Sequence, residues 1–162
     1  MILSKTLRAT ALAFAVASGL AGCAGPRVSD YAAETPTLDL ARFFDGTVNA
    51  HGVFTDRSGA VVKRFGVVMT CRWQGDEGVL EKHANGRYSG TADDVVGVAE
   101  GQASGNAFNW RYTLRLSSGG KLVEVQFDDW MYLMDERVML NKAVMSKFGI
   151  RLGEVTLAFY KS

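Results

Sequence analysis

Apolar and polar side chains alternate with a period of two along most of the chain from residue 47 to its end. This alternation predicts β-strands with one buried face, because successive side chains on a strand point to opposite sides of the sheet. The clearest apolar rows take every second position of two segments: Val61, Phe65, Val67, Met69, Cys71 and Trp73, interrupted only by Lys63, and then Phe108, Trp110, Tyr112, Leu114 and Leu116. Both rows are predicted to face a common interior.

Short polar segments with glycine separate the predicted strands. Asp56-Arg57-Ser58-Gly59 suits a type I turn, and Asn85-Gly86 accepts the positive φ angles of a hairpin. About nine short strands are expected, at 47–55, 61–73, 79–83, 87–92, 98–104, 108–116, 121–134, 137–147 and 154–160. Successive hairpins favour an all-β, up-and-down antiparallel barrel over a sandwich, since closure removes exposed edges.

The first 22 residues have the layout of a bacterial secretory signal. Lys5 and Arg8 precede an apolar run that ends at Leu20, and this run is too short to cross a bilayer, which takes roughly 20 apolar residues. Leu20-Ala21-Gly22-Cys23 then resembles a lipobox, in which the Cys23 thiol receives a diacylglyceryl group and the new N-terminus is acylated. Two or more acyl chains give stable anchoring. We therefore predict lipid attachment at Cys23, with a secreted protein that carries a chance cysteine there as the alternative.

The lipobox predicts three parts: a signal peptide at 1–22, a lipidated N-terminus and tether at 23–44, and a β-barrel domain at 45–162. The tether holds both prolines of the chain and should keep the domain off the bilayer. Its last residues, 38–44, are predicted to form a short helical turn or a plug against the domain.

Two further observations bear on the compartment. Ala24 follows the lipobox cysteine where an aspartate would often retain such a protein in the inner membrane, so the outer membrane, facing the periplasm, is favoured. Cys71 is the only other cysteine, and an unacylated Cys23 would be able to pair with it in an oxidising periplasm.

Composition excludes some partners. Removing the 22-residue signal from the 162-residue chain leaves 140 residues, enough for one domain with a core. The signal holds two of the 18 basic residues and none of the 17 acidic ones, so the mature chain is close to neutral. Because no basic patch is evident, nucleic acid is not an expected partner. The sequence names no protein partner.

Asp128-Asp129-Trp130 is the most suggestive site for chemistry. Adjacent strand residues point to opposite faces, so the two carboxylates form no acid/base pair unless a bulge intervenes. Asp129 shares the inward face of its strand, which predicts either a bulge or a buried carboxylate paired with Arg111 or Arg137. A structural ion pair or turn cap is favoured over catalysis, with Asp129, Arg111 and Arg137 as the candidates if the protein is an enzyme.

No metal or cofactor is predicted. His51 and His83 are the only histidines, and with Cys23 acylated and Cys71 inward no zinc ligand set exists at the usual spacing. The serines lack a Gly-x-Ser-x-Gly elbow, and no glycine-rich loop precedes a helix to bind phosphate.

Aromatic and methionine side chains predict a cavity for an apolar molecule. The candidates are Phe108, Trp110, Tyr112, Met131 and Met139. Ordinary core packing is the alternative for such a row, but small β-barrels that are not fully packed hold single apolar ligands.

Several segments together resemble one family. They are 39–46 (DLARFFDG), 56–59 (DRSG), 91–97 (TADDVVG), 105–110 (GNAFNW), 127–131 (FDDWM) and 147–149 (KFG). They are similar to an uncharacterised lipoprotein family of Gram-negative bacteria, known as a domain of unknown function, across nearly the whole mature chain. The resemblance implies a lipocalin-like (calycin-type) barrel of about eight or nine strands and assigns no catalytic residue. The family pattern is longer by about a hairpin near Glu81-Lys82, so this chain is expected to lose one or two strands, leaving the barrel smaller, open at an edge or poorly folded.

Three functions are consistent with these features. The first is an envelope lipoprotein that binds a lipid or other apolar small molecule in a barrel cavity. The second is a lipid-modifying enzyme that uses Asp129 and an arginine. The third is a structural or interaction lipoprotein without a cavity, which would expose a contiguous apolar patch. We favour them in that order.

Overall fold

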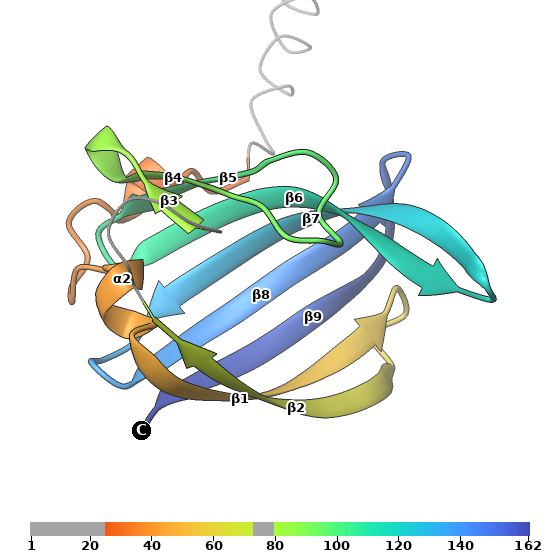
Figure 1. Ribbon diagram of the computed structural model, residues 1–162, viewed down its shortest axis with the longest axis horizontal. Coiled ribbons are helices and arrows are strands. Elements are labelled where there is room, and N and C mark those ends of the chain that lie inside the picture. Colours follow the sequence, from red (N-terminus) through yellow and green to blue (C-terminus); the bar gives the residue numbers. More distant parts are fainter. Residues whose placement is uncertain (1–24, 73–79) are drawn as a thin grey trace, which may run out of the picture.

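The computed structural model of the protein describes residues 25–72 and 80–162, and Figure 1 shows their arrangement. The strands of this part of the chain are β1 (Gly46–Asp56), β2 (Val61–Cys71), β3 (Leu80–Lys82), β4 (Arg87–Gly90), β5 (Ala99–Ser104), β6 (Ala107–Ser118), β7 (Lys121–Leu133), β8 (Val138–Lys147) and β9 (Ile150–Lys161). Its short helical segments are η2 (Val28–Tyr31), α2 (Leu40–Phe43) and η3 (Ala84–Gly86).

Some predictions fall outside these residues. The secretory signal, the lipidated Cys23 and the end of the first apolar row at Trp73 all do. Among the helices that the structure does describe, none has the length and apolarity needed to cross a membrane.

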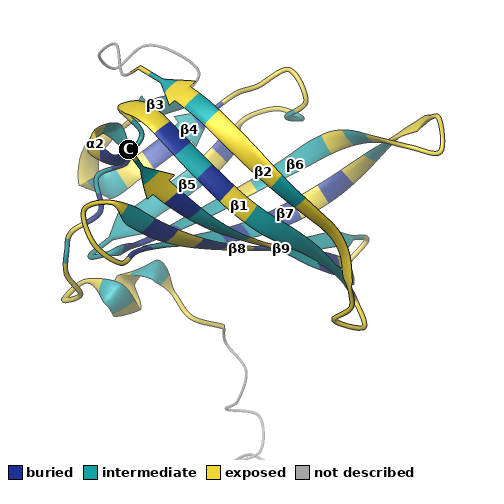
Figure 2. Cartoon of the chain, turned by 90° about the horizontal axis from the view of Figure 1, so that it is seen from below, coloured by how far each residue is buried: buried dark blue, intermediate teal, exposed yellow. Residues whose placement is uncertain are grey.

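The strands form one antiparallel sheet in the order β2-β1-β9-β8-β7-β6-β5-β4-β3. Strands consecutive in sequence are hydrogen-bonded neighbours except β2 and β3, and β1 pairs with β9 over residues 48–56. The two ends of the meander therefore meet, and the sheet curls into a half-barrel that is open between β2 and β3 (Figures 1 and 2). The predicted fold class, an incomplete lipocalin-like barrel of antiparallel strands, is confirmed.

Two-residue turns fix the register of the long hairpins. Gly119 and Gly120 join β6 to β7 with φ angles of 59° and 75°, the left-handed values that a type I′ turn requires. Phe148 and Gly149 join β8 to β9 in the same way, with φ angles of 52° and 76°. Phe148 takes this conformation although the residue is 89% exposed, and the Lys147 ammonium group lies over its ring, 5.2 Å from the centroid.

The core lies on the concave side of the sheet, in two clusters. The first surrounds α2 at one end of the half-barrel and contains Leu38, Leu40, Phe43, Val48, Ala50, Tyr88, Phe108, Leu133, Met139 and Phe159. Asp39 starts the helix by accepting hydrogen bonds from the backbone N–H groups of Ala41 and Arg42, at 3.0 and 3.4 Å. The prediction of a short helical turn or plug at residues 38–44 is thus confirmed.

The second cluster lies farther along the strands, toward the end without a helix. Its buried members are Val125, Phe127 and Ala143. Six partly buried side chains pack against these: Tyr112, Leu114, Leu116, Val123, Met145 and Val155. Much of this apolar surface therefore stays accessible, in contrast to the first cluster.

The residues before α2 lie against the barrel. Tyr31 of η2 contacts two aromatic rings on the outer face of β7, with centroid distances of 5.9 Å to Trp130 and 5.4 Å to Tyr132. The backbone N–H of Leu38 donates to the carbonyl of Gly105 at 2.8 Å. The segment predicted as a tether is thus packed on the domain from η2 onward.

The apolar row of β2 is more exposed than predicted. Val61 and Val67 are 47% and 39% exposed, and Phe65, Met69 and Cys71 are half-buried. The prediction of a buried face is wrong here because β2 has no described strand beyond it. Its inner face is therefore covered from one side only.

Candidate functional site

Three adjacent strands bring polar side chains together inside the half-barrel. In the registers of the sheet, Asp129 of β7 lies opposite Trp110 of β6 and Ala143 of β8. Tyr112 and Asn141 stand two residues away from these positions on the same face, so both are diagonal neighbours of Asp129. Asp129 and Asn141 are 5% and 3% exposed, which places the group in the interior.

Neutral donors satisfy the buried carboxylate. The Tyr112 hydroxyl donates to Oδ2 of Asp129 at 3.0 Å, and the side-chain amide of Asn141 donates to Oδ1. The same amide lies 3.4 Å from the carbonyl oxygen of Trp130. We call Tyr112, Asp129 and Asn141 the polar belt, because they separate the two apolar clusters of the core.

The structure corrects the predicted partners of Asp129. No bulge interrupts β7 beside it, since its registers with β6 and β8 are continuous there. Arg111 lies on the outer face and pairs with Asp128 at 3.4 Å. Arg137 is exposed after β7 and donates to the carbonyl of Lys161 at 3.3 Å. Neither arginine pairs with Asp129.

Burial sets the electrostatics of the belt. Desolvation raises the pKa of Asp129 to about 6 from an ordinary value of 3.8, although the hydrogen bonds from Tyr112 and Asn141 lower it. The nearby charge of Asp128 adds a smaller increase. Burial, followed by the charge of Asp129, raises the pKa of Tyr112 far above its usual range. The belt thus holds a carboxyl group that changes protonation in mildly acidic solution, beside a hydroxyl that keeps its proton.

A hollow lies next to the belt. It has a volume of about 350 Å³ and lies between β6 and the segment at 91–95. The largest side chains that line it are Leu80, Val95, Trp110, Tyr112 and Leu114. Tyr112 belongs both to this wall and to the belt, so a molecule in the hollow would lie close to the buried carboxyl group.

The five predicted cavity residues divide between packed core and open wall. Phe108 and Met139 are 2% and 0% exposed and fill the first cluster, and Met131 packs against that cluster. Trp110 and Tyr112 line the hollow. The structure therefore brings two of the five to an accessible surface.

Sequence reasoning missed Asn141. It follows Met139 and precedes Ala143 and Met145 on the inward row of β8, and all three neighbours on that row are apolar. A polar residue within an apolar row is the same signal that singled out Asp129. The sequence therefore marks Asn141 as an unusual inward residue, but it does not show that Asn141 lies beside Asp129, because that depends on the register between β7 and β8.

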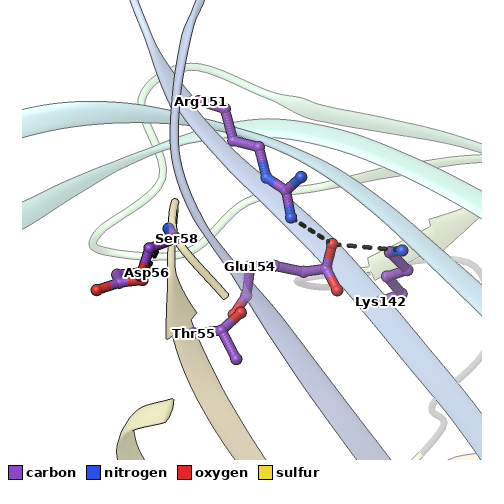
Figure 3. Close-up of polar contacts among 6 residues, drawn as sticks. All are labelled: Thr55, Asp56, Ser58, Lys142, Arg151 and Glu154. Atoms are coloured by element: carbon purple, nitrogen blue, oxygen red, sulfur yellow. Dashed lines mark hydrogen bonds and ion pairs between the residues drawn. The ribbon is translucent and has the colours of Figure 1, made fainter. Parts of the chain in front are cut away.

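A second polar cluster, at the end of the half-barrel opposite α2, has a structural role (Figure 3). Glu154 of β9 has a side chain only 15% exposed and pairs with Arg151 at 2.9 Å and with Lys142 at 3.3 Å. Beside it, Thr55 of β1 donates its hydroxyl to the carbonyl of Glu154 at 3.3 Å. These contacts join β8, β9 and the end of β1 and explain the cluster without a ligand.

The Asp56 side chain stabilises the turn that follows β1. Asp56 accepts hydrogen bonds from the backbone and hydroxyl of Ser58, at 2.8 and 2.6 Å. These bonds, the hydroxyl contact above all, lower the pKa of Asp56. Asp56 thus stabilises the turn predicted at residues 56–59.

In the described residues no group of three or more His, Cys, Asp or Glu side chains is close enough to hold a metal ion.

Comparison with known proteins gives a family and no activity. No curated protein matches the chain. A family model described as "Protein of unknown function (DUF3833)" matches residues 17–83 and 79–161, in two stretches that meet at 79–83. The junction falls where the sequence predicted a shortened segment, beside Glu81-Lys82, and where the sheet is open between β2 and β3. Because the two stretches cover most of the chain, the protein belongs to the DUF3833 family of proteins of unknown function.

Proposed function

We propose that this protein is an envelope lipoprotein, anchored through acyl chains on Cys23, that holds one apolar small molecule inside its half-barrel. The anchor rests on the lipobox at residues 20–23 and on the secretory signal before it. The outer membrane, with the domain facing the periplasm, is the proposed location.

The half-open second cluster carries the binding part of the proposal. Leu114, Leu116 and Val155 are only partly buried on the concave face. The hollow of about 350 Å³ adjoins this wall, and its lining is apolar except for Tyr112, Thr91 and Asp94. A volume of this size lies at the lower end of the range of small-molecule sites. Covering this surface with an apolar ligand is favourable, because it removes the side chains from water.

The polar belt gives the proposed site an orientation. Tyr112 offers an aromatic wall, and its hydroxyl is bonded to Asp129 behind it. A ligand with a hydrogen-bonding head group would place that head toward the belt and its apolar part toward Leu114. Neither candidate arginine reaches Asp129, so the acid/base pair that a lipid-modifying enzyme would use is not assembled, which favours binding.

A matched pair of variants tests the binding site. Leu114→Glu puts a charge on the concave wall, whereas Leu122→Glu puts the same charge on a side chain of β7 that is 71% exposed. With the apolar probe N-phenyl-1-naphthylamine, we expect affinity to fall about tenfold or more in the first variant and to stay unchanged in the second. Val95→Trp, which fills the hollow without adding charge, should also weaken binding and covers the case in which Leu114→Glu fails to fold. Equal affinity in all four proteins would refute the proposal.

The anchor has its own test. Cells grown with radiolabelled palmitate should label the full chain, and Cys23→Ser should abolish the label. Native mass spectrometry of protein extracted from membranes should then show a bound apolar molecule in addition to the covalent acyl chains. An unlabelled chain would disprove the anchor without touching the binding proposal.

A further inference from the structure

Strand β2 has an open edge. Among residues 25–72 and 80–162 it is hydrogen-bonded only to β1, with which it pairs from Val61 to Cys71 except at Val62. Figure 2 shows it at the border of the sheet, mostly in the colour of exposed residues. An edge of eleven residues offers backbone N–H and C=O groups to any strand that can align with it.

The side chains of β2 are apolar on both faces. Val68, which pairs with Asn49 on the outer face, is 71% exposed, and Val67, which pairs with Ala50 on the inner face, is 39% exposed. Val61 and Val62, beside the register shift at the start of β2, are 47% and 56% exposed. Edge strands of soluble proteins are usually short, bulged or protected by charge. β2 is long and carries only Lys63 and Arg64 as charges. Its one irregularity lies near its start, where the pairing with β1 skips Val62, and from Lys63 to Cys71 the register is continuous.

We infer that β2 pairs with β2 of a second copy of this chain, antiparallel and edge to edge, about a two-fold axis at Gly66. The occupant has to supply an extended strand of about eleven residues whose inner face is mostly apolar, and β2, with Lys63 as the one charge on that face, meets this requirement. β3 of the same chain does not, because it has three residues and is already paired with β4. An isologous contact of this kind closes as a dimer and leaves neither β2 edge open.

Charge selects the register. With Gly66 opposite itself, all eleven residues overlap, Lys63 lies opposite Met69 and Arg64 lies opposite Val68. No cation of one copy therefore lies opposite a cation of the other. Cations placed directly opposite each other would destabilise the pair. Phe65 then lies opposite Val67, and such aromatic and β-branched cross-strand pairs are favourable. The register also keeps inner rows on one side of the joined sheet, because residues of the same parity meet.

The midpoint of β2 is suited to close approach. Gly66 is exposed and has no side chain, and the nearest atoms to a Cβ built there would be those of the His51 ring and the Ala50 carbonyl oxygen of its own chain, at 3.4 to 3.7 Å. A glycine within a strand often marks a place where another backbone comes near. Gly66 lies five residues from either end of β2, where the two-fold axis of a full overlap has to pass.

Co-purification of two differently tagged full chains from detergent-solubilised membranes tests the contact. The wild-type copies should co-purify. Val68→Lys should lower the recovered partner about tenfold, since it faces Arg64 of the other copy twice in the dimer. Leu122→Lys is the matched control, because Leu122 is also 71% exposed but lies on β7, which is paired on both sides. Recovery that both variants leave unchanged, or wild-type copies that never co-purify, overturns the inference.

Disulfide trapping tests the register. In a Cys71→Ser background, Gly66→Cys should form a disulfide-linked dimer on mild oxidation, since residues opposite each other in an antiparallel pair lie within disulfide range. Val68→Cys should not, because in this register it lies opposite Arg64 and far from its own copy. Equal cross-linking of both variants, or a linked partner that is a different protein, contradicts a two-fold axis at Gly66.

Discussion

Tyr112 and Asp129 face each other across two neighbouring strands, with the hydroxyl donating to the carboxylate at 3.0 Å in the interior of the half-barrel. The pair lies at the boundary between packed core and accessible apolar wall. A buried carboxyl group that is satisfied by neutral donors alone is costly to ionise, so its protonation and the stability of the fold are coupled.

Stability should fall as the pH rises through the titration of Asp129. Its pKa is about 6 in the folded protein and near 3.8 when unfolded, so the folded state binds more protons between these values. The contribution is complete below pH 3.8 and is lost as the pH passes 6, and the difference corresponds to about 3 kcal/mol. Asp129→Asn removes this group, and its amide can accept from Asn141 and donate to Tyr112. Urea unfolding at pH 4 to 7.5 should therefore show the variant gaining stability relative to wild type as the pH rises.

Parallel pH profiles for wild type and Asp129→Asn would contradict this account. Tyr112→Phe provides a second check, because it removes a hydrogen bond that lowers the pKa of Asp129. In this variant the loss of stability should move to higher pH. A shift in the opposite direction would mean that the hydroxyl does not favour the ionised carboxylate.

Asn141→Ala should destabilise the fold more than Asn109→Ala. Asn141 is 3% exposed and donates to buried Asp129, so its loss leaves a carboxylate oxygen without that donor. Asn109 donates to Asp128 at 2.6 Å on the outer face, where water can replace it. We expect a loss of roughly 1 to 3 kcal/mol for the first and well under 1 kcal/mol for the second, measured by urea unfolding at pH 7. Similar losses of stability in the two variants would show that the buried hydrogen bond from Asn141 contributes no more than the outer one from Asn109.

The plug before β1 should contribute strongly to stability. Phe43 is 3% exposed in the first cluster, and its removal leaves a cavity under α2. Phe43→Ala is expected to cost about 3 to 5 kcal/mol, whereas Phe148→Ala, at 89% exposure, should cost little. Thermal unfolding of the two variants gives the comparison. An equally small effect in both would mean that the barrel is stable without its plug.

Much of this architecture follows from local pattern. Alternation along β6 and β7 was enough to place Phe108, Tyr112 and Phe127 inward, and it also placed Asp129 inward. The same alternation places Arg111 on the outer face, between inward-facing Trp110 and Tyr112. The pattern of β6 alone therefore argues against Arg111 as the partner of inward-facing Asp129.

The register between neighbouring strands and the order of strands in the sheet could not be predicted from the alternating pattern. Asn141 reaches Asp129 only because β8 pairs with β7 at that offset, and period-two patterns do not specify an offset between strands. The exposure of Val61 and Val67 likewise depends on whether another strand covers β2, which no residue within β2 encodes. The resemblance to a longer family pattern was the one signal that pointed to an open edge there.

The packing of η2 on the barrel should depend on a single glycine. A Cβ at Gly105 would lie 1.8 Å from the carbonyl oxygen of Tyr31, so Gly105→Ala should push η2 away from Trp130 and Tyr132. Gly119→Ala is a close control, because its φ of 59° matches the 55° of Gly105 and its Cβ would meet open space. Both variants pay the left-handed backbone cost of roughly 1 to 2 kcal/mol. Gly105→Ala should lose a further 1 to 3 kcal/mol, roughly, through overpacking.

Limited trypsin digestion distinguishes the overpacking against Tyr31 from the backbone cost that both variants share, because only the overpacking should release η2 from the barrel. Arg27 directly precedes η2, and release of this segment should speed cleavage there in Gly105→Ala while Gly119→Ala behaves as wild type. The barrel itself should stay resistant in both variants, because Gly105 lies between β5 and β6 and its added carbon meets the segment at Tyr31 and Glu34. If both variants are cleaved at the wild-type rate, the contact of Tyr31 with the outer face does not hold the segment. In that case residues 25–39 act as the free tether that the sequence predicts.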